Sequence, residues 1–543
     1  MTAPISPPWA WLDLPAAHHR AYAQSGVWSH QTLADLAIKR AANDPHVPML
    51  VEAGRTLTIS ALLADATALA AALAARGLRP GEVVSFQLPN WAEAAVINLA
   101  ASLGGYVVNP IVPIYRDAEV AMMLADCRAR LLFVPAAFRT FDYAGMANRL
   151  AGQLPDLAAV VTVRGTGDDD LGALLEVGRT LPFERPPIDP HGVKMVLYTS
   201  GTTGRPKGVL HSQATLDRVM RKSSTYWGIE AGDAVLIPSP VTHISGYTNG
   251  LELPLAMGTV SILMESWNAA DAIALIDRYH VVGTVAATPF LVELADAARA
   301  SRSRLASLRF FACGGAAVPD EVIPVADAAF DRCHAFRVFG SSEVPLVTYG
   351  WPDDPHRAAT SDGRVIDYEV RIVDDDGRDL GVGQEGEILA RGPSMMIGYA
   401  DQTQTREAIT DDGYFRTGDL GVIDAAGGLT ITGRKKDLII RGGENISARE
   451  IEDVLHRHPQ VREAAVVAMP HPRLGEGVCA YVVAADPAVD GVMLAAHVGA
   501  SGLAKQKIPE RFEFVDDFPR TASGKIRKDQ LRAMVRVAIE ASA

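Results

Sequence analysis

One glycine-rich loop between two apolar runs constrains this chain more than any other feature. Residues 198–209 read Tyr-Thr-Ser-Gly-Thr-Thr-Gly-Arg-Pro-Lys-Gly-Val, with strand-like runs at Val193–Tyr198 and Gly208–His211 on either side. The glycines let backbone N–H groups approach an anion, the hydroxyls add donors, and Lys207 adds a positive charge. The loop therefore predicts a polyphosphate site, whose contacts are expected to come from Thr199, Ser200, Gly201, Thr202, Thr203, Gly204 and Lys207.

Two other interpretations of this loop are disfavoured. It is not a Walker loop, because Gly208 follows Lys207 where Ser or Thr would bind magnesium, and because a strand rather than a helix is expected next. A solvated surface turn has no need of a lysine among three hydroxyls and three glycines.

Bulk properties narrow the class of protein. A chain of 543 residues is too long for one core, so two or more domains are expected. The formal charge of −13 argues against a nucleic-acid-binding surface. Four cysteines without CxxC spacing argue against a disulfide scaffold and fit a reducing cytoplasm. Neither a signal peptide nor a run of about eighteen apolar residues is found, so no membrane span is predicted.

Helix-like and strand-like segments alternate over most of the chain. Ser60–Arg76 predicts an Ala/Leu-rich helix with Ser60 as N-cap and Gly77 as its stop. This alternation predicts an α/β fold with a parallel sheet covered on both faces. A helix is also expected at Trp91–Leu103, and strands at Val83–Leu88, Leu131–Pro135, Val235–Ile237, Val260–Met264, Val281–Ala286 and Leu308–Ala312.

The pattern changes towards the C-terminus. Tyr368–Ala390 and Gly428–Thr432 contain only strand and turn signals, which predicts a smaller β-rich subdomain. A charged break at Gly433–Asp437 separates it from a compact α+β segment. That segment is expected to hold a helix at Ala448–His458, with Ser447 and Glu450 as a capping box, and strands at Val461–Met469, Val478–Val483 and Arg511–Val515. We therefore expect a large N-terminal domain, residues 1–433, and a small mobile domain, residues 434–543.

Three further motifs carry chemistry. In Phe339-Gly340-Ser341-Ser342-Glu343, the Phe339 ring could stack on a base, Ser342 could bind phosphate and Glu343 could bind Mg²⁺, although Ser and Glu after a strand often only begin a helix. Asp419 could accept hydrogen bonds from two ribose hydroxyls, with Arg434 as a second contact, although Thr-Gly-Asp turns are common. Lys525 follows Gly524 in a turn that would otherwise be a solvated basic tail.

In this order, from about Trp28 to Lys528, the motifs resemble the adenylate-forming superfamily of acyl-CoA synthetases, luciferases and peptide-synthetase adenylation domains. Phe339 and Ser342 stand where the family usually has Tyr and Thr, and they keep a ring and a hydroxyl. The resemblance implies ATP, Mg²⁺ and coenzyme A. It also implies that Lys525 bridges the acyl carboxylate and the α-phosphate, where negative charge grows in the transition state.

The resemblance suggests roles for several more residues. The backbone of Gly315 and Ala316 would lie against the adenine, and Lys436 would be the hinge between domains. Gly442, Gly443 and Glu444 would line a pantetheine tunnel, although on sequence alone they could equally form a β-turn.

The substrate pocket is expected around His243. Peptide-synthetase domains have an aromatic-Asp pair where this chain has Thr242-His243, so the substrate is expected to lack an α-amino group. We place His243 near the substrate carboxylate, although a single His is more often structural. The other pocket residues, expected to be Thr288, Gly314, Gly340, Val344 and Pro345, are small or apolar. Ser239–Leu255 resembles medium-chain and cyclohexanecarboxylate-type ligases, so a medium-chain, alicyclic or aromatic acid is expected.

The leading hypothesis is an acyl-CoA synthetase that forms acyl-AMP and then the CoA thioester. An acyl-AMP ligase that loads a carrier protein would share every adenylation residue. A nucleotide-binding protein without catalysis is disfavoured, because Lys207, Glu343, Asp419 and Lys525 are all present. No feature of the sequence predicts luciferase-like oxygenation. The expected partners are the acid, ATP and CoA, and homodimer formation is left open.

Overall fold

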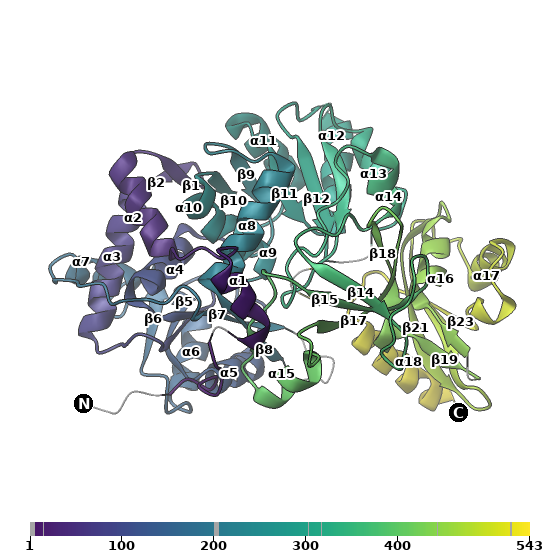
Figure 1. The fold of residues 1–543 in the computed structure, drawn as a ribbon. Coiled ribbons are helices and arrows are strands. Elements are labelled where there is room, and N and C mark those ends of the chain that lie inside the picture. The colour runs from purple at the N-terminus through teal and green to yellow at the C-terminus, as the bar shows by residue number, and fades with distance from the viewer. Residues whose placement is uncertain are drawn as a thin grey trace.

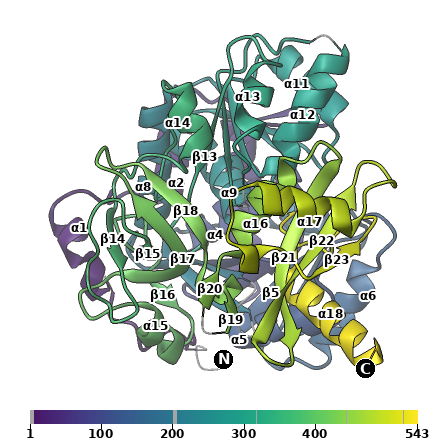
Figure 2. The same cartoon turned by 90° about the vertical axis from the view of Figure 1, so that its right-hand side faces the viewer.

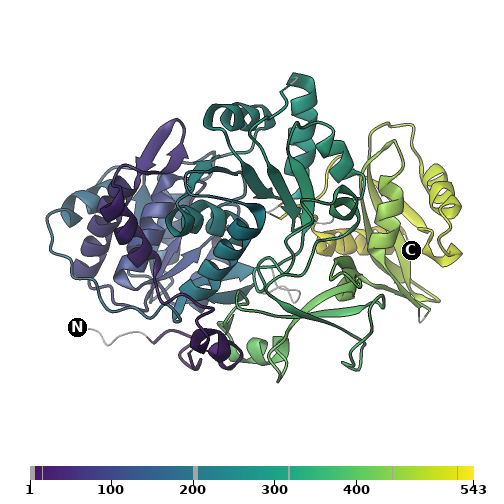
Figure 3. The same cartoon turned by 45° about the horizontal axis from the view of Figure 1, so that its top comes forward.

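The computed structural model describes residues 6–14, 16–199, 206–301, 303–315, 318–442, 444–521 and 524–542. A large N-terminal part contains three sheets, and a smaller C-terminal part, with a fourth sheet, lies at one end of the molecule (Figure 1). Figure 3 shows the green β-rich subdomain along the lower edge between them. This confirms the predicted fold class: layered α/β sheets, a β-rich subdomain and a small α+β C-terminal part. No helix in the described ranges combines the length and apolar character needed to cross a lipid bilayer.

The first sheet carries the glycine-rich loop. Its strand order is β16-β8-β7-β4-β3-β5-β6, and β3 to β7 run parallel. β8 runs antiparallel to β7, so the loop joins two neighbouring strands, as its flanking sequence predicts. The strands are β3 (Val83–Phe86), β4 (Val107–Pro110), β5 (Ala129–Pro135), β6 (Ala159–Val163), β7 (Val193–Thr199), β8 (Lys207–Ser212) and β16 (Gly398–Tyr399).

The second sheet has the order β13-β12-β11-β9-β10-β1-β2 and is parallel except for β2. One apolar core joins it to the first sheet, because buried side chains of both sheets pack on the same helices, α2 (Leu33–Asn43), α3 (Ile59–Ala75), α4 (Ala92–Gly104), α8 (Gln213–Trp227) and α10 (Leu253–Met257). The strands are β1 (Pro48–Glu52), β2 (Arg55–Thr58), β9 (Ala234–Ile237), β10 (Val260–Leu263), β11 (Gly283–Ala286), β12 (Phe310–Gly314) and β13 (His334–Val338).

Shorter helices complete the N-terminal part. A π-helical turn, Thr248–Glu252, separates α9 (Ile244–Tyr247) from α10. The others are α1 (Arg20–Gln24), α5 (Asp117–Asp126), α6 (Tyr143–Ala151), α7 (Leu171–Gly178), α11 (Ala269–Tyr279), α12 (Thr288–Ser301), α13 (Val322–Asp327), α14 (Pro355–Thr360) and α15 (Gln402–Ala408).

Helix α3 begins one residue earlier than predicted, and Ser60 is not its N-cap. Thr58, in an extended conformation at the end of β2, is the cap, and its side chain accepts a hydrogen bond from the Ala61 N–H at 3.4 Å. Ser60 lies inside the first turn. The predicted stop at Gly77 agrees with the structure, since Gly77 has a φ of +89° just after the helix.

The β-rich subdomain and the C-terminal part lie side by side (Figure 2). The antiparallel subdomain sheet consists of β14 (Glu369–Val373), β15 (Gly386–Arg391), β17 (Phe415–Ile423) and β18 (Leu429–Arg434). The C-terminal part contains β19 (Ile439–Arg441), β20 (Glu444–Ile446), β21 (Val461–His471), β22 (Gly475–Ala484), β23 (Arg511–Phe514), α16 (Ala448–His456), α17 (Gly491–Ala500) and α18 (Lys528–Ser542).

The start of α16 links these two parts. Ser447 is its N-cap residue, but no capping box forms, because the Ser447 hydroxyl donates to the Thr432 carbonyl of β18 at 2.9 Å. Glu450 instead pairs with Lys507. Arg434 is the last residue of β18, so the strand runs one residue past the expected end of the N-terminal domain. The division into domains stays a prediction.

A buried ion pair lies at the centre of the N-terminal core. The ammonium of Lys194 on β7 contacts the carboxylate of Glu252, which ends the π-helical turn and is fully buried. Lys194 also donates to Asn98 Oδ1 at 3.2 Å and to the Tyr247 hydroxyl at 3.1 Å. Burial lowers the pKa of Lys194, and the Glu252 carboxylate opposes that shift. This cluster joins α4, β7, α9 and the π-helical turn.

Removing one member of this pair should destabilise the N-terminal part. Lys194→Met leaves the buried Glu252 carboxylate without its cation, which should lower the free energy of unfolding by about 3–5 kcal/mol in urea titrations followed by circular dichroism. The double variant with Glu252→Gln should lose less. As a control, Arg179→Met breaks an exposed pair with Asp65 and should cost less than about 1 kcal/mol. Equal losses in the two single variants would contradict this account.

Candidate active site

A single cavity of about 740 Å³ lies where the N-terminal sheets, the β-rich subdomain and the C-terminal part meet. Its wall includes Thr199 at the end of β7, Gly314 at the end of β12, Asp419 on β17 and Lys525 from the C-terminal part. The carboxyl ends of parallel strands supply much of one side, which is where ligands bind in open α/β sheets.

Lys525 reaches the cavity from the tip of a tight turn. Gly524 has a φ of +82°, which favours glycine. The Thr521 N–H donates to the Lys525 carbonyl at 2.7 Å, and the Lys525 N–H donates to Thr521 Oγ1 at 3.1 Å. The Lys525 Cε lies 3.8 Å from where a Cβ on Gly315 would stand. The structure therefore brings the predicted lysine to the predicted glycine.

Opposite charges surround the Lys525 ammonium. Burial is the largest influence and lowers the pKa of Lys525 to about 8, and the neighbouring Arg434 guanidinium acts in the same direction. The Asp419 and Glu343 carboxylates favour the charged form and oppose the shift. The cavity thus brings Arg434, Asp419 and Glu343 of the predicted nucleotide site close to Lys525.

Asp419 stands on a bulge in β17, not in a turn before the strand as predicted. Glu387 of β15 pairs with Leu420, and Leu389 pairs with Arg416. Between these two pairs β17 advances by four residues while β15 advances by two. The extra residues carry Asp419 out to the cavity wall. The sequence Thr-Gly-Asp has a turn-like composition because its glycine forms this bulge within a continuous strand.

Arg434 fixes the Asp419 carboxylate. Its Nε lies 2.9 Å from Asp419 Oδ1, and the two residues are direct partners across β17 and β18. Burial raises the pKa of Asp419, and Arg434 opposes this effect. Since only Oδ1 takes part in this bond, the second carboxylate oxygen is left for another donor.

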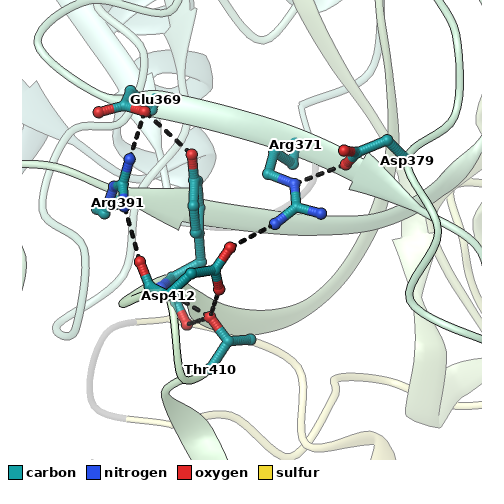
Figure 4. Close-up of polar contacts among 7 residues, drawn as sticks. Glu369, Arg371, Asp379, Arg391, Thr410 and Asp412 are labelled. Atoms are coloured by element: carbon teal, nitrogen blue, oxygen red, sulfur yellow. Dashed lines mark hydrogen bonds and ion pairs between the residues drawn. The ribbon is translucent and has the colours of Figure 1, made fainter.

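A polar network on the outer face of the subdomain holds the turn that leads into β17 (Figure 4). Tyr414, just before the strand, donates its hydroxyl to Glu369 at 3.0 Å, and Arg391 donates to the same carboxylate at 2.7 Å. Arg371 bonds to Asp412 at 2.8 Å, on the other side of the Tyr414 ring. The turn is thereby fixed to β14 and β15, so the start of β17 is held in place.

Lys207 and Thr199 face each other across the glycine-rich loop. They are partners at the ends of β8 and β7, and both lie on the cavity wall. The Lys207 ammonium lies 5.0 Å from the centre of the Tyr399 ring. The other predicted phosphate contacts lie outside the described residues: Ser200, Gly201, Thr202, Thr203 and Gly204.

Glu343 is held at the cavity wall by Tyr399. The Tyr399 hydroxyl donates to Glu343 Oε1 at 3.0 Å, which leaves Oε2 for another partner. The Ser342 carbonyl accepts a hydrogen bond from His211 Nε2 at 2.7 Å. Because a carbonyl can only accept, this bond requires the proton of His211 to be on Nε2. Tyr399 was not predicted, since no periodic pattern surrounds it.

His243 lies on the wall and is neutral at pH 7. Burial, with a smaller contribution from Lys525, lowers its pKa to about 4. Its Nδ1 lies 3.1 Å from Ser245 Oγ. Gly314, Gly315, Gly340, Ser341 and Pro345 also line the cavity, as their predicted roles require.

Three predicted residues lie behind the wall rather than on it. Val344 is fully buried in the apolar core that also holds Val209. Thr288 begins α12 and its Oγ1 lies 3.7 Å from Cys313 Sγ, within a buried layer. The Phe339 ring packs on the subdomain core, so its contact with adenine stays a prediction. A sequence neighbour of each lies on the wall: Ala287 before Thr288, Gly340 after Phe339 and Pro345 after Val344.

The wall contains pocket residues that sequence reasoning missed. They include Val285 at the end of β11, Phe290 on α12, and Thr248 and Asn249 on the π-helical turn. A π-helical turn has no distinct periodicity in sequence, so the side chains that it turns inward could not be identified. Ala316 lies outside the described residues.

Two of the predicted tunnel residues, Gly442 and Glu444, are not at the cavity in this arrangement. Gly442 and Glu444 belong to the β19–β20 hairpin, and the Glu444 carboxylate accepts a hydrogen bond from Gln506 at 2.8 Å. Gly443 lies outside the described residues. Lys436, the predicted hinge, lies on the cavity wall just after β18.

Comparisons with known proteins agree with this geometry. The AMP-binding enzyme family matches residues 38–400, and the AMP-binding enzyme C-terminal domain matches residues 450–525. The medium-chain fatty-acid–CoA ligase of Escherichia coli is 35% identical over 524 residues, covering 94% of this chain and 92% of the ligase. The sulfoacetate–CoA ligase of Cupriavidus necator is 36% identical over 507 residues, covering 92% and 97%.

A solved structure shares the whole architecture. ATP-bound MatB from Rhodopseudomonas palustris superposes with a TM-score of 0.84 at 28% identity, covering 93% of this chain and 99% of MatB. The matched family, the long relatives and the shared fold lead to one conclusion: this chain belongs to the AMP-binding, adenylate-forming enzymes and is an acid–thiol ligase.

Proposed function

We propose that this enzyme activates a carboxylic acid, whose only charged group is the carboxylate, as acyl-AMP and then transfers the acyl group to coenzyme A. The supporting observation is that Lys525 shares one cavity with Lys207, Glu343 and Asp419. A carboxylic acid is a poor electrophile, so the enzyme must hold ATP, neutralise charge at the α-phosphate and exclude water. Each of these tasks has a residue in this cavity.

In the first step, the acid carboxylate attacks the α-phosphate and pyrophosphate leaves. The glycine-rich loop and Lys207 hold the leaving phosphates, and Asp419 accepts hydrogen bonds from the ribose hydroxyls. The Lys525 ammonium contacts the acyl carboxylate and the α-phosphate oxygens, where negative charge grows. His243, near the carboxylate, is neutral and so adds no competing charge.

The site fits a magnesium ion that arrives with ATP. Mg²⁺ is commonly bound by one or two carboxylates together with substrate phosphates. Glu343 presents one such carboxylate at the cavity, with its other oxygen held by Tyr399. No group of three or more potential ligands occurs in the described part of the chain, which fits a site completed by substrate. When bound there, Mg²⁺ would neutralise triphosphate charge.

The second step requires a different domain arrangement. The β19–β20 hairpin with Gly442 and Glu444 lies away from the cavity here, whereas Lys525 occupies it. Rotation about Lys436 would withdraw Lys525 and bring the hairpin, with Gly443, to the acyl-AMP. The CoA thiol then attacks the acyl carbon and AMP leaves.

The pocket favours an acid without a second charge. The apolar side chains on its wall include Leu197, Val219, Val285, Phe290 and Leu346. The sulfoacetate–CoA ligase is named for an acid that carries a sulfonate. Among the described residues, segments 239–249 and 285–290 of the wall include no Lys or Arg, which supports a medium-chain, alicyclic or aromatic acid instead.

A carrier-protein ligase is the second candidate, because it would use the same adenylation residues. Acid-dependent pyrophosphate release from Mg-ATP should therefore be measured with short, medium, cyclic and aromatic acids, with and without CoA, following acyl-CoA by mass. We expect a thioester that requires CoA. Adenylate without a thioester would favour the carrier-protein ligase, and no turnover with any acid would contradict the proposal.

Removing the Lys525 ammonium should abolish the first step. Lys525→Ala is expected to slow acid-dependent ATP–pyrophosphate exchange by at least about 100-fold, as loss of one transition-state donor does elsewhere. Lys505→Ala, at an exposed lysine of the same domain, serves as the matched control. Normal exchange by Lys525→Ala, with an unchanged melting temperature, would refute this role.

The same lysine should give adenylation a pH limit. The pKa of Lys525 is lowered to about 8, so its charged form is lost as pH rises through that value. The kcat/KM for adenylation, which reports the free enzyme, should therefore fall above about pH 8. Lys525→Arg should be slower but should not show this fall, because a guanidinium stays charged. A wild-type profile that is flat to pH 10 would count against this assignment.

A further inference from the structure

Besides Thr242, His243 and Ser245, three further polar side chains interrupt the apolar part of the cavity wall. Ser239 follows β9, and Thr248 and Asn249 belong to the π-helical turn. We call these three residues the polar wall. Polar groups placed in a mostly apolar pocket fix the orientation and identity of a ligand, so their free hydrogen-bonding capacity is informative.

All three side chains already use a donor within the protein. Ser239 Oγ donates to the Val285 carbonyl at 3.3 Å, and Thr248 Oγ1 donates to the Ile244 carbonyl at 2.8 Å. Asn249 Nδ2 donates one of its two hydrogens to the Ser245 carbonyl at 2.8 Å and keeps the second N–H. A hydroxyl has only one hydrogen, so Ser239 and Thr248 have oxygen lone pairs left for a ligand and no donor.

Asn249 presents the strongest acceptor of this wall. Its amide cannot be turned over, because the Ser245 carbonyl accepts hydrogen bonds only and would then face Oδ1. Among the described residues, no donor to Asn249 Oδ1 is found, and Asn249 lines the cavity. The nearby Thr242 hydroxyl also has no partner, but its oxygen is fully enclosed and cannot reach a ligand.

The polar wall is held rigidly from behind. The Asn249 carbonyl accepts from Ser261 Oγ at 3.1 Å, which fixes the turn to β10. Glu252, at the end of the same turn, is anchored by Lys194 and also accepts from Gln213 at 3.2 Å. A pre-organised acceptor of this kind discriminates more strongly than a mobile one, because little ordering is needed on binding.

Within the described residues, the segments that hold the polar wall contribute no cation to the cavity lining. The described cationic residues that line the cavity lie on β8, β17 and β18 or after them in sequence, and none lies at residues 239–249 or 285–290: Lys207, Arg416, Arg434, Lys435, Lys436 and Lys525. A second anionic group held against Asn249 Oδ1 would meet a further oxygen acceptor, which is costly in a buried site.

We propose that the acid substrate carries a hydrogen-bond donor, a hydroxyl or N–H group, on its body, and that this group donates to Asn249 Oδ1. Asn249 would then be a specificity-determining residue that selects donor-bearing alicyclic or aromatic acids over their unsubstituted parents and over diacids. This inference rests on the proposed acid activation and narrows its substrate class.

The test compares matched acids. Cyclohexanecarboxylate and benzoate are each compared with their 2-, 3- and 4-hydroxy isomers and with the corresponding dicarboxylates, by kcat/KM for pyrophosphate release. One hydroxy isomer should exceed its parent by about 10-fold, the discrimination of one net hydrogen bond. The dicarboxylates should be the poorest substrates.

Variants assign that preference to one atom. Asn249→Leu should bring the hydroxy-to-parent ratio close to one, mainly by lowering kcat/KM for the hydroxy acid. Thr248→Val removes the neighbouring hydroxyl acceptor of the same turn, so a ratio that is kept in Thr248→Val and lost in Asn249→Leu assigns the contact to Asn249, whereas loss of the ratio in Thr248→Val would overturn that assignment. Melting temperatures of both variants separate a lost contact from a lost fold.

Each outcome has a distinct meaning. No hydroxy isomer above its parent, a preference that survives Asn249→Leu, or efficient use of a dicarboxylate would overturn this inference while leaving acid activation intact. Absence of pyrophosphate release with every acid would instead overturn the proposed function on which it rests.

Discussion

The electrostatic attraction between the Lys525 ammonium and the cavity carboxylates is the interaction on which the arrangement depends. The lysine belongs to the C-terminal part, whereas Asp419 and Glu343 belong to the N-terminal part. Charges interact strongly in a buried site because little water screens them. The position of the C-terminal part and the charge balance of the cavity are therefore linked: moving the domain changes the number of cations beside the two acids.

The scaffold holds the two acids within the N-terminal part and presents the lysine from the C-terminal part. Asp419 stands on a strand bulge and is bonded to Arg434, while Glu343 is bonded to Tyr399. The surface network around Tyr414 holds the turn before that strand. By contrast, the Lys525 turn is closed by its own contacts with Thr521.

Sequence reasoning reached the fold class and most of the site because those features are local. The glycine-rich loop between two strands, the βα alternation and the Lys525 turn each depend on a few adjacent residues. Cap identities were less accessible, since Thr58 and Ser60 both have hydroxyls and only the backbone conformation at the end of β2 selects Thr58. Ser447 lost its capping bond to a carbonyl of a distant strand, β18, which no local pattern could reveal.

The acyl pocket was the hardest region to predict, for a related reason. Whether Val344 or Pro345 lines the cavity depends on a strand-end rotation, and Asn249 enters through a π-helical turn without a sequence signature. The same backbone details set the pocket chemistry, because the bond from Asn249 Nδ2 to the Ser245 carbonyl fixes the amide orientation of a residue that lines the cavity.

Charge and hydrogen bonding together give the cavity a direction. Its described cations come from β8, β17, β18 and the C-terminal part, whereas Asn249 on the π-helical turn offers an oxygen acceptor. If the acid bound in the opposite orientation, its carboxylate oxygens would face Asn249 Oδ1. The Lys525 ammonium would then have no substrate carboxylate beside it. An acid whose carboxylate faces Lys525 and whose remaining part is neutral avoids this repulsion. An acid with a hydrogen-bond donor on that neutral part can also bond to Asn249 Oδ1. The cavity would therefore orient its substrate before the chemistry begins, through the same separation of charges that the adenylation step requires.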